Sequence, residues 1–258
     1  MTTTLAQSLA ADLGAALDPC VLATRAGITP DGWQERMLRS SSPRLLINAS
    51  RQSGKSLMSA LLVAHTALYQ PNALSLLVAP SERQSGEGFR RVKAILRDLG
   101  EVPSSESVLR CELRNGSRVV SLPGREQTVR GFSAPSLIVI DEAARVPDDL
   151  YVALRPMLSV SQGRVVACST PYGTRGWWYE AWRSTEAWER YRIPASEVPR
   201  ISSEFLAEEE RTLSRWEYLQ EYCCSFEASS GAVFDLSDVE ACFDNSVKGF
   251  GLLGSAWS

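Results

Sequence analysis

The sequence predicts an α/β fold with a mainly parallel central sheet flanked by helices. From Leu45 onward, short apolar segments alternate with helix-like ones, as in parallel strands joined by helical crossovers. The chain has 258 residues, of which 44% are hydrophobic and 22% charged, which is ordinary for a globular protein with a sizeable core. No segment approaches the roughly 18 apolar residues of a membrane helix, and the start lacks the order of a signal peptide. We therefore expect a cytoplasmic protein with no membrane partner.

The composition restricts the chemistry. Six cysteines form no C-x-x-C pair, and the single histidine, His65, lies in a predicted helix far from them. Reduced thiols are favoured over disulfides or a zinc site, and His65 is interpreted as a helix-face residue. The net charge of -3 argues against coating nucleic acid through bulk charge, although a local basic stripe stays open. Catalysis must therefore depend on carboxylates, hydroxyls and arginines.

The core elements follow in order along the chain. "RLLINA" is strand-like, and a helix is predicted from Lys55 to Tyr69. "LSLLVAP" is a second buried strand, and "QSGEGFRRVKAILRDLG" is an amphipathic helix that stops at Gly100. "SLIVIDEAARV" resumes the core as an apolar strand ending in two acids, and "GRVVACSTP" is the fourth core strand. These segments carry the parallel part of the predicted sheet.

A β-hairpin is predicted between the second helix and the acidic strand. "VLRCELRNGSRVVSLPG" alternates apolar and polar residues around Asn115-Gly116, a strong hairpin-turn signal. We expect this hairpin to be an insertion in the α/β core.

The sequence predicts a division of the chain into four segments. Residues 1–30 form an N-terminal extension, 31–199 the core, 200–240 a small helical subdomain, and 241–258 a C-terminal remnant. The segment from Ile201 to Glu227 is predicted to be wholly helical, with Ser202 or Ser203 as its cap. The final "GSAWS" resembles the front of an affinity tag, so we expect the natural protein to continue beyond about residue 250.

"NASRQSGKSL" nearly matches the phosphate-binding pattern G-x-x-x-x-G-K-[ST]. Ala49 stands where the first glycine is expected. In a strand-loop-helix turn, backbone N–H groups wrap a phosphate, while Lys55 would neutralise the β- and γ-phosphates and Ser56 would offer its hydroxyl to Mg²⁺. The alternative is a glycine-containing helix cap in another α/β protein. The residues expected to bind nucleotide in this loop are Ala49, Ser50, Arg51, Gln52, Ser53, Gly54, Lys55 and Ser56.

The predicted strand in "LIVIDEA" ends in two acidic residues, Asp141 and Glu142. Asp141 is expected to support the Mg²⁺ ion, and Glu142 to orient and deprotonate the attacking water. The alternative is the first turn of a helix, where carboxylates favour the positive dipole end. The loop and this strand together, in this order, predict a nucleoside triphosphatase.

The next strand ends in Ser169 and Thr170. Their hydroxyls could hydrogen-bond the γ-phosphate and report its loss. A polar strand end before a proline turn is the alternative interpretation.

These motifs together resemble the ATPase domain of the large terminase subunit of tailed bacteriophages. Trp33-Gln34 in "DGWQERMLRS" is similar to that family's adenine-side glutamine motif, and "SRQSGKS" to its deviant phosphate loop with an arginine, here Arg51. "VRGFSAPSLIVIDEAARV" resembles its Walker B region, and "STPYGTRGWWYEAW" its coupling motif. "FLAEEERTLSRWEYLQEYCCSFEASSGAVFD" resembles its helical linker subdomain. The resemblance covers about residues 30–240.

The resemblance implies an ASCE-type P-loop NTPase fold that uses ATP and Mg²⁺. The catalytic glutamate directly follows the Walker B aspartate, as Glu142 follows Asp141, and Trp33 and Gln34 would flank the base. Thr170 would couple γ-phosphate loss to movement. A trans-acting arginine would complete a neighbour's site; Arg130 is our candidate, Arg51 its rival acting in cis, and a solvated surface role is the alternative for Arg130.

The same resemblance implies the partners. It implies double-stranded DNA, assembly into a ring, taken as a pentamer, on the portal, the portal protein and a small terminase subunit, all in the host cell cytoplasm. The family's C-terminal nuclease is not expected here, because the late acids are interpreted as a solvated helix face. These acids are Asp235, Asp238, Glu240 and Asp244.

DNA contact is harder to assign. Two arginine groups could meet phosphates, although arginines on a hairpin are more often solvated. They are Arg110, Arg114, Arg118 and Arg125 near the hairpin, and Arg83, Arg90 and Arg91 near the second helix. The tryptophans in "GWWYEAW" are expected to pack rather than stack on bases.

Two rival functions stay open. One is a helicase-like, DNA-dependent ATPase that acts on single strands. The other is a nucleotide-bound scaffold that docks on the portal or the small terminase without turnover.

Overall fold

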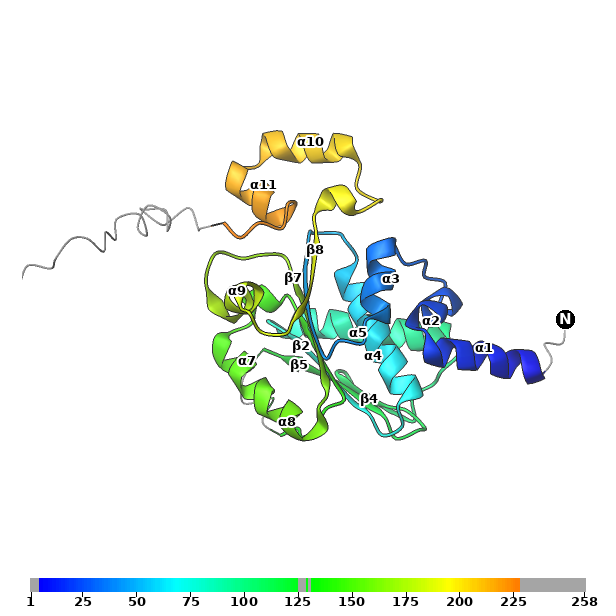
Figure 1. Cartoon of the computed structure of the whole chain (residues 1–258). Helices are drawn as coiled ribbons and strands as arrows, with labels where there is room; N and C mark the ends of the chain where they lie inside the picture. The colour runs from blue at the N-terminus through cyan, green and yellow to red at the C-terminus, as the bar shows by residue number, and fades with distance from the viewer. Residues whose placement is uncertain (1–4, 125–128, 130, 228–258) are drawn as a thin grey trace, which may run out of the picture. The chain divides into compact units, whose positions relative to one another are not determined.

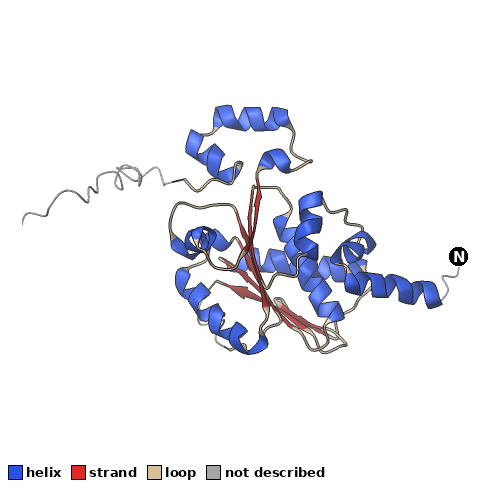
Figure 2. Ribbon diagram, in the orientation of Figure 1, coloured by secondary structure: helices blue, strands red, loops and turns tan. Residues whose placement is uncertain are grey.

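The chain folds around an eight-stranded sheet (Figure 1, Figure 2). The computed structural model describes residues 5–124, 129 and 131–227. The strand order is β3-β4-β5-β2-β6-β7-β1-β8; the β3–β4 and β4–β5 pairs are antiparallel and the others parallel, which confirms the predicted fold class. The strands are β1 Arg44–Ala49, β2 Leu74–Ala79, β3 Ser105–Glu106, β4 Arg110–Glu112, β5 Arg118–Pro123, β6 Leu137–Asp141, β7 Arg164–Ser169 and β8 Glu189–Ile193.

Helices cover both faces of the sheet (Figure 2). In the described part of the chain, no helix is long and apolar enough to cross a membrane. The α-helices are α1 Leu5–Leu17, α2 Pro19–Arg25, α3 Gly32–Arg39, α4 Lys55–Tyr69, α5 Glu82–Asp98, α7 Asp148–Leu154, α8 Leu158–Ser161, α9 Gly176–Arg183, α10 Ser203–Thr212 and α11 Arg215–Glu221. Short 3-10 helices are η1 Ala143–Arg145, η2 Arg155–Met157 and η3 Ala195–Glu197.

Two hydrophobic clusters fill the layers above and below the sheet. Because side chains alternate along a strand, Leu45 and Ile47 of β1 join the cluster under α4 and α5, while Leu46 joins the cluster under α7 and α9. Trp177 and Trp178 of α9 are buried in the second cluster, so the prediction that these tryptophans pack is confirmed. Both faces of the central strands are therefore buried under helices.

The predicted hairpin forms, and its second strand is part of the main sheet. Cys111 of β4 pairs with Val119 of β5, and β5 in turn pairs in parallel with β2. Gly116 has a φ of 79°, the left-handed conformation that the turn requires. The Asn115 side-chain amide donates to the Ala67 and Leu68 carbonyls at 2.9 and 3.0 Å, so the turn also caps the end of α4.

Strand β8 has no counterpart in the sequence prediction. Its residues, "ERYRI", carry three charges and lack the apolar run of a buried strand. It forms because β1 offers a free edge: Leu45 pairs with Glu189 and Ala49 with Ile193. The charged side chains suit an edge strand.

The helical segment after Ile201 is interrupted, so the prediction of one wholly helical stretch is wrong. α10 ends at Thr212, and α11 begins after Ser214, whose hydroxyl forms a capping box with Glu217. Ser202, rather than Ser203, caps α10 by accepting from the Phe205 N–H at 3.2 Å.

The N-terminal helices pack against α4. His65 Nε2 lies 3.1 Å from the Ala15 carbonyl oxygen, and burial lowers the pKa of this imidazole. His65 is thus a structural helix-face residue, and the five described cysteines are free thiols. The predicted domain boundaries remain predictions, and residues 241–258 lie outside the described part of the chain.

Candidate nucleotide-binding site

The loop between β1 and α4 has the backbone shape of a phosphate cradle. Gly54, the N-cap of α4, has a φ of 87°, and Gln52 a φ of 59°. Inside the loop, the Ser53 hydroxyl donates to the Ser50 carbonyl oxygen at 2.8 Å. A Cβ at Gly54 would lie 2.8 Å from Gln34 Nε2 and 3.3 Å from a guanidinium nitrogen of Arg200. The close approach and the left-handed backbone together require glycine here.

Several polar groups of this loop are buried. Lys55 is 7% exposed, and its ammonium group donates across the loop to the Ser50 carbonyl oxygen at 3.4 Å. The Ser50 hydroxyl is buried and has no hydrogen-bond partner among the described residues. Ser56 lies half-buried in the first turn of α4. A phosphate at the N-terminus of this 15-residue helix would meet unpaired N–H groups and the positive end of the dipole.

Residues distant in sequence fix the Ser53 carbonyl group. Gln34 Nε2 donates to it at 3.1 Å, and Arg200 donates to it at 2.9 Å. Arg200 also pairs with Asp31 at 2.6 Å, and Asp31 donates its N–H to the Gln34 side chain. The Gln34 side chain therefore holds the loop through the Ser53 carbonyl group, and its predicted position beside the base stays a prediction.

Trp33 is part of the hydrophobic core. The Trp33 side chain is 4% exposed and belongs to the hydrophobic cluster under α4 and α5. Its predicted position beside the base stays a prediction.

Asp141 is the last residue of β6, and Glu142 directly follows it. Asp141 Oδ1 accepts from the Glu142 N–H at 3.0 Å and from the Cys168 thiol at 3.3 Å. The Cys168 sulfur also lies 3.4 Å from the hydroxyl of Ser59, one turn along α4 from Lys55. Burial, followed by the nearby Asp141 carboxylate, raises the pKa of the Cys168 thiol, so the thiol stays protonated and donates. Cys168 thus joins the acidic strand to the helix of the phosphate loop.

Glu142 occupies a conformation that few non-glycine residues adopt. Its φ of 52° turns the chain sharply from β6 into η1. Non-glycine residues with a positive φ, such as Glu142, are often found at functional sites. The side chains of Asp141 and Glu142 are both half-buried.

The polar end of β7 contacts the turn that follows Glu142. The Ser169 hydroxyl accepts from the Ala144 N–H at 3.2 Å, and both Ser169 and Thr170 are buried. Of the predicted coupling pair, Ser169 therefore contacts the turn that follows Glu142.

The last turn of α11 also reaches this region. The Arg51 N–H donates to the Glu221 carbonyl oxygen at 3.2 Å, and Arg51 Nε lies 3.3 Å from the Glu221 carboxylate. Gln220, which is buried, accepts from the Gly173 N–H at 3.2 Å just after the β7 end. The helical segment thus contacts both the loop after β1 and the segment that follows β7.

Some predicted residues are not tested by this geometry. Arg130 and Arg125 lie outside the described residues. Arg110 pairs with Glu112 at 3.9 Å, and Arg90 with Glu87 at 3.0 Å, so both lie in surface ion pairs. Sequence reasoning missed Arg200, Cys168 and Gln220, because their partners lie far away in the chain.

Comparison with known proteins identifies the family of this chain. A family model described as the N-terminal part of the terminase large subunit, T4likevirus type, matches residues 46–241. The chain belongs to this family.

Individual terminases agree with this assignment. The chain is 27% identical over 224 residues to the terminase large subunit of Escherichia phage T5, covering 81% of this chain and 50% of that protein. It therefore spans half the length of this curated relative. The large terminase ATPase domain of Thermus phage P74-26 superposes with a TM-score of 0.71 at 22% identity, over 79% of this chain and 96% of that one.

Another large terminase shows the same fold at lower identity. The HK97 bacteriophage large terminase superposes with a TM-score of 0.62 at 15% identity, over 76% of this chain and 50% of that one. Together with the sheet described above, these likenesses show that the chain has the α/β fold of large terminase ATPase domains.

Proposed function

We propose that this terminase domain is an Mg²⁺-dependent ATPase whose hydrolysis drives double-stranded DNA into a capsid. One observation carries the proposal: the Ser59–Cys168–Asp141 contacts hold the acidic strand end against the helix of the phosphate loop. Phosphoryl transfer needs this pairing of a phosphate cradle with carboxylates that serve metal and water.

Each residue of the site would have a separate role in ATP hydrolysis. Lys55 would pair with the β- and γ-phosphates, and the loop N–H groups would bind their oxygens. The Ser56 hydroxyl and the Asp141 carboxylate are hard oxygen ligands of the kind that Mg²⁺ prefers, and the ion would neutralise phosphate charge. Glu142 would accept a proton from the attacking water.

Other residues would bind or report the nucleotide. Gln34 and Trp33 would lie on the adenine side, and Arg51 would act on the phosphates in cis. Ser169 and Thr170 would pass the loss of the γ-phosphate to the turn after Glu142, with which Ser169 is in contact. The large terminase of a thermophilic bacteriophage has been solved with ADP and with ATP-γ-S, which supports nucleotide binding in this fold.

The family supports the wider assembly. We propose that several copies form a ring, taken as a pentamer, on the portal protein, and that the ring receives DNA with the help of a small terminase subunit in the host cytoplasm. Arg130 would complete the site of a neighbouring copy.

The first experiment measures phosphate release with ATP and Mg²⁺ over a wide range of protein concentration, with and without duplex DNA. We expect a specific rate that rises with concentration and with DNA. Glu142→Gln should lower it by about a hundredfold or more while ATP binding is retained, because general-base catalysis contributes roughly 10² to 10⁴. The matched control is Glu101→Gln at an exposed position after α5. Unchanged turnover in Glu142→Gln would remove the glutamate from its role.

Mixed rings test the arginine. Arg130→Ala and Glu142→Gln subunits are each expected to be inactive alone. Partial recovery of turnover on mixing would show that Arg130 acts on a neighbour's site, whereas no recovery would contradict the trans assignment.

A further inference from the structure

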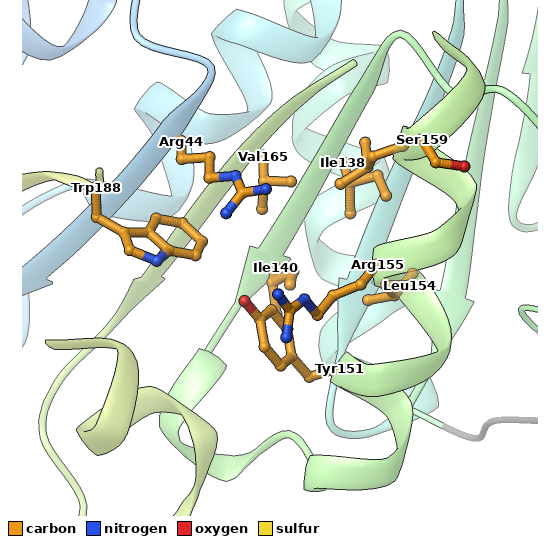
Figure 3. Close-up of a pocket in the computed structure, with 10 residues that line it drawn as sticks. Arg44, Ile138, Ile140, Tyr151, Leu154, Arg155, Ser159, Val165 and Trp188 are labelled. Atoms are coloured by element: carbon orange, nitrogen blue, oxygen red, sulfur yellow. The ribbon is translucent and has the colours of Figure 1, made fainter. Parts of the chain in front are cut away.

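A cavity separate from the nucleotide site lies between the sheet and α7–α8 (Figure 3). Its volume is about 230 Å³, and its floor is formed by Ile138 and Ile140 of β6 and Val165 of β7. None of the residues assigned to nucleotide, metal or coupling lines it. Its size is below the roughly 300–1,000 Å³ of sites for whole ligands, so it suits one compact group.

Two guanidinium groups point into this apolar cavity from opposite sides (Figure 3). Arg44 enters from the start of β1 and lies over the Trp188 ring, with 5.9 Å from Cζ to the ring centroid. Arg155 enters from η2 and lies 6.0 Å from the Tyr151 ring centroid. Both arginines act electrostatically on the Tyr151 phenol, so they share one small region. Arg44 has 46% of its side chain exposed and Arg155 is also exposed, so a solute can reach both guanidinium groups from solvent.

The surrounding acids leave one positive charge uncompensated. Glu186 lies 3.8 Å from Arg44, and its carboxylate also accepts from the Trp188 indole N–H at 3.2 Å. Among the described residues, no carboxylate pairs with Arg155. Two guanidiniums and one carboxylate give a net charge of +1 around the cavity, which matches one singly charged anion better than a phosphate.

We infer that this cavity binds a carboxylate carried on a compact apolar group. The apolar group would lie on the isoleucine floor, and the carboxylate would accept from the planar guanidinium forks, which suit bidentate contacts. Two sources share this chemistry: a free small acid and the C-terminal residue of a polypeptide.

The test follows Ile138 and Ile140 by NMR in protein labelled at isoleucine δ1 methyl groups. The probes are N-acetyl-L-leucine and its uncharged isostere N-acetyl-L-leucinamide. The acid should shift both methyl signals saturably, and the amide should bind about tenfold or more weakly, because it cannot form charge-assisted hydrogen bonds with the guanidinium groups. Equal binding of acid and amide, or shifts confined to other methyls, would overturn the inference.

Three variants locate the charge. Arg155→Gln and Arg44→Gln should each remove most of the preference for the acid. Arg97→Gln, at an arginine on α5 with 78% side-chain exposure, should leave it unchanged. Unaltered methyl signals outside the cavity show that each variant is folded. A preference that survives both cavity substitutions would contradict the assignment.

A peptide arm separates the two sources. A pentapeptide that ends in leucine with a free carboxylate is compared with its C-terminally amidated form and with N-acetyl-L-leucine. Binding of the free peptide about tenfold tighter than N-acetyl-L-leucine would support a chain terminus as ligand. Tighter binding of the small acid would support a metabolite-sized ligand. Because no nucleotide is present, these results do not depend on whether the chain hydrolyses ATP.

Discussion

The phosphate loop and the acidic strand end are held in place by different means. The loop is bound by distant segments: Gln34 of α3, Arg200 before α10 and the last turn of α11 all contact it. The strand end is held by its immediate sheet neighbour, through Cys168 and Ser169 of β7. The loop therefore depends on remote parts of the chain, whereas the acids depend on strand register. Substitutions remote in sequence should thus weaken nucleotide binding, and substitutions on β7 should act on metal use and turnover.

The largest effect is expected from Gly54→Ala. The new Cβ would displace the Gln34 amide from Ser53 and impose a left-handed alanine, at a combined cost of roughly 2–4 kcal/mol. If that strain opens the loop, ATP affinity should fall by about a hundredfold, as measured by calorimetry. Gly27→Ala is the control, because Gly27 has a similar φ of 72° and nothing within 4 Å of the new Cβ. Equal loss of affinity in both variants would contradict a role for the Gln34 contact.

Arg200→Ala should have the next largest effect. It removes a charged donor to Ser53 and the pair with Asp31, so ATP affinity should fall about tenfold while turnover at saturating ATP changes little. Arg39→Ala is matched in exposure, 52% against 48%, and pairs with acids away from the loop. Unchanged affinity in Arg200→Ala would show that the loop does not need its remote contacts.

Cys168→Ala tests the other side of the comparison. Without the thiol donor, the Asp141 carboxylate loses one contact that orients it, and we expect a several-fold higher Mg²⁺ requirement. ATP affinity measured in EDTA should be unchanged, and Cys168→Ser should restore part of the Mg²⁺ response. Cys111→Ala controls for the loss of a buried thiol, since Cys111 is 1% exposed on β4. A loss of ATP affinity in EDTA would place Cys168 with the loop instead.

The smallest effect is expected from Glu221→Gln. The Arg51 side chain is 65% exposed, and such pairs contribute about 0–1 kcal/mol. The backbone bond between the two residues is retained, so ATP affinity should change by less than about threefold, and the change should disappear at high salt. A larger, salt-independent change would show that α11 controls the loop through this side chain.

The sequence predicted the core well where strands are apolar and loops carry a motif. β1, β2, β6 and β7 were all visible as apolar runs, and the Asn115-Gly116 turn was visible as a dipeptide. β8 was not, because an edge strand needs few apolar residues. The break between α10 and α11 had a signal, the S-x-x-E pattern at Ser214 and Glu217, which strong helical composition on both sides obscured.

The site was predictable as separate residues and not as a network. Lys55, Asp141 and Glu142 follow from short motifs, because their chemistry fixes their spacing. Arg200 acts through a backbone carbonyl, and any donor at that place could serve, so no pattern marks it. The thiol of Cys168 looked like one core residue among six cysteines until the register of β6 and β7 placed it beside Asp141.

The pairing of β8 with β1 has a mechanical consequence. β8 leads through η3 directly to Arg200 and α10, and it runs parallel to the strand that ends in the phosphate loop. A pull on the helical segment along the strand axis would load the ladder from Leu45 to Ala49 in shear, with its hydrogen bonds sharing the force. Shear resists rupture better than peeling, in which bonds break one after another. This edge of the sheet is therefore suited to pass a pull on the helical segment, directed along the strand axis, into β1 and the sheet behind it.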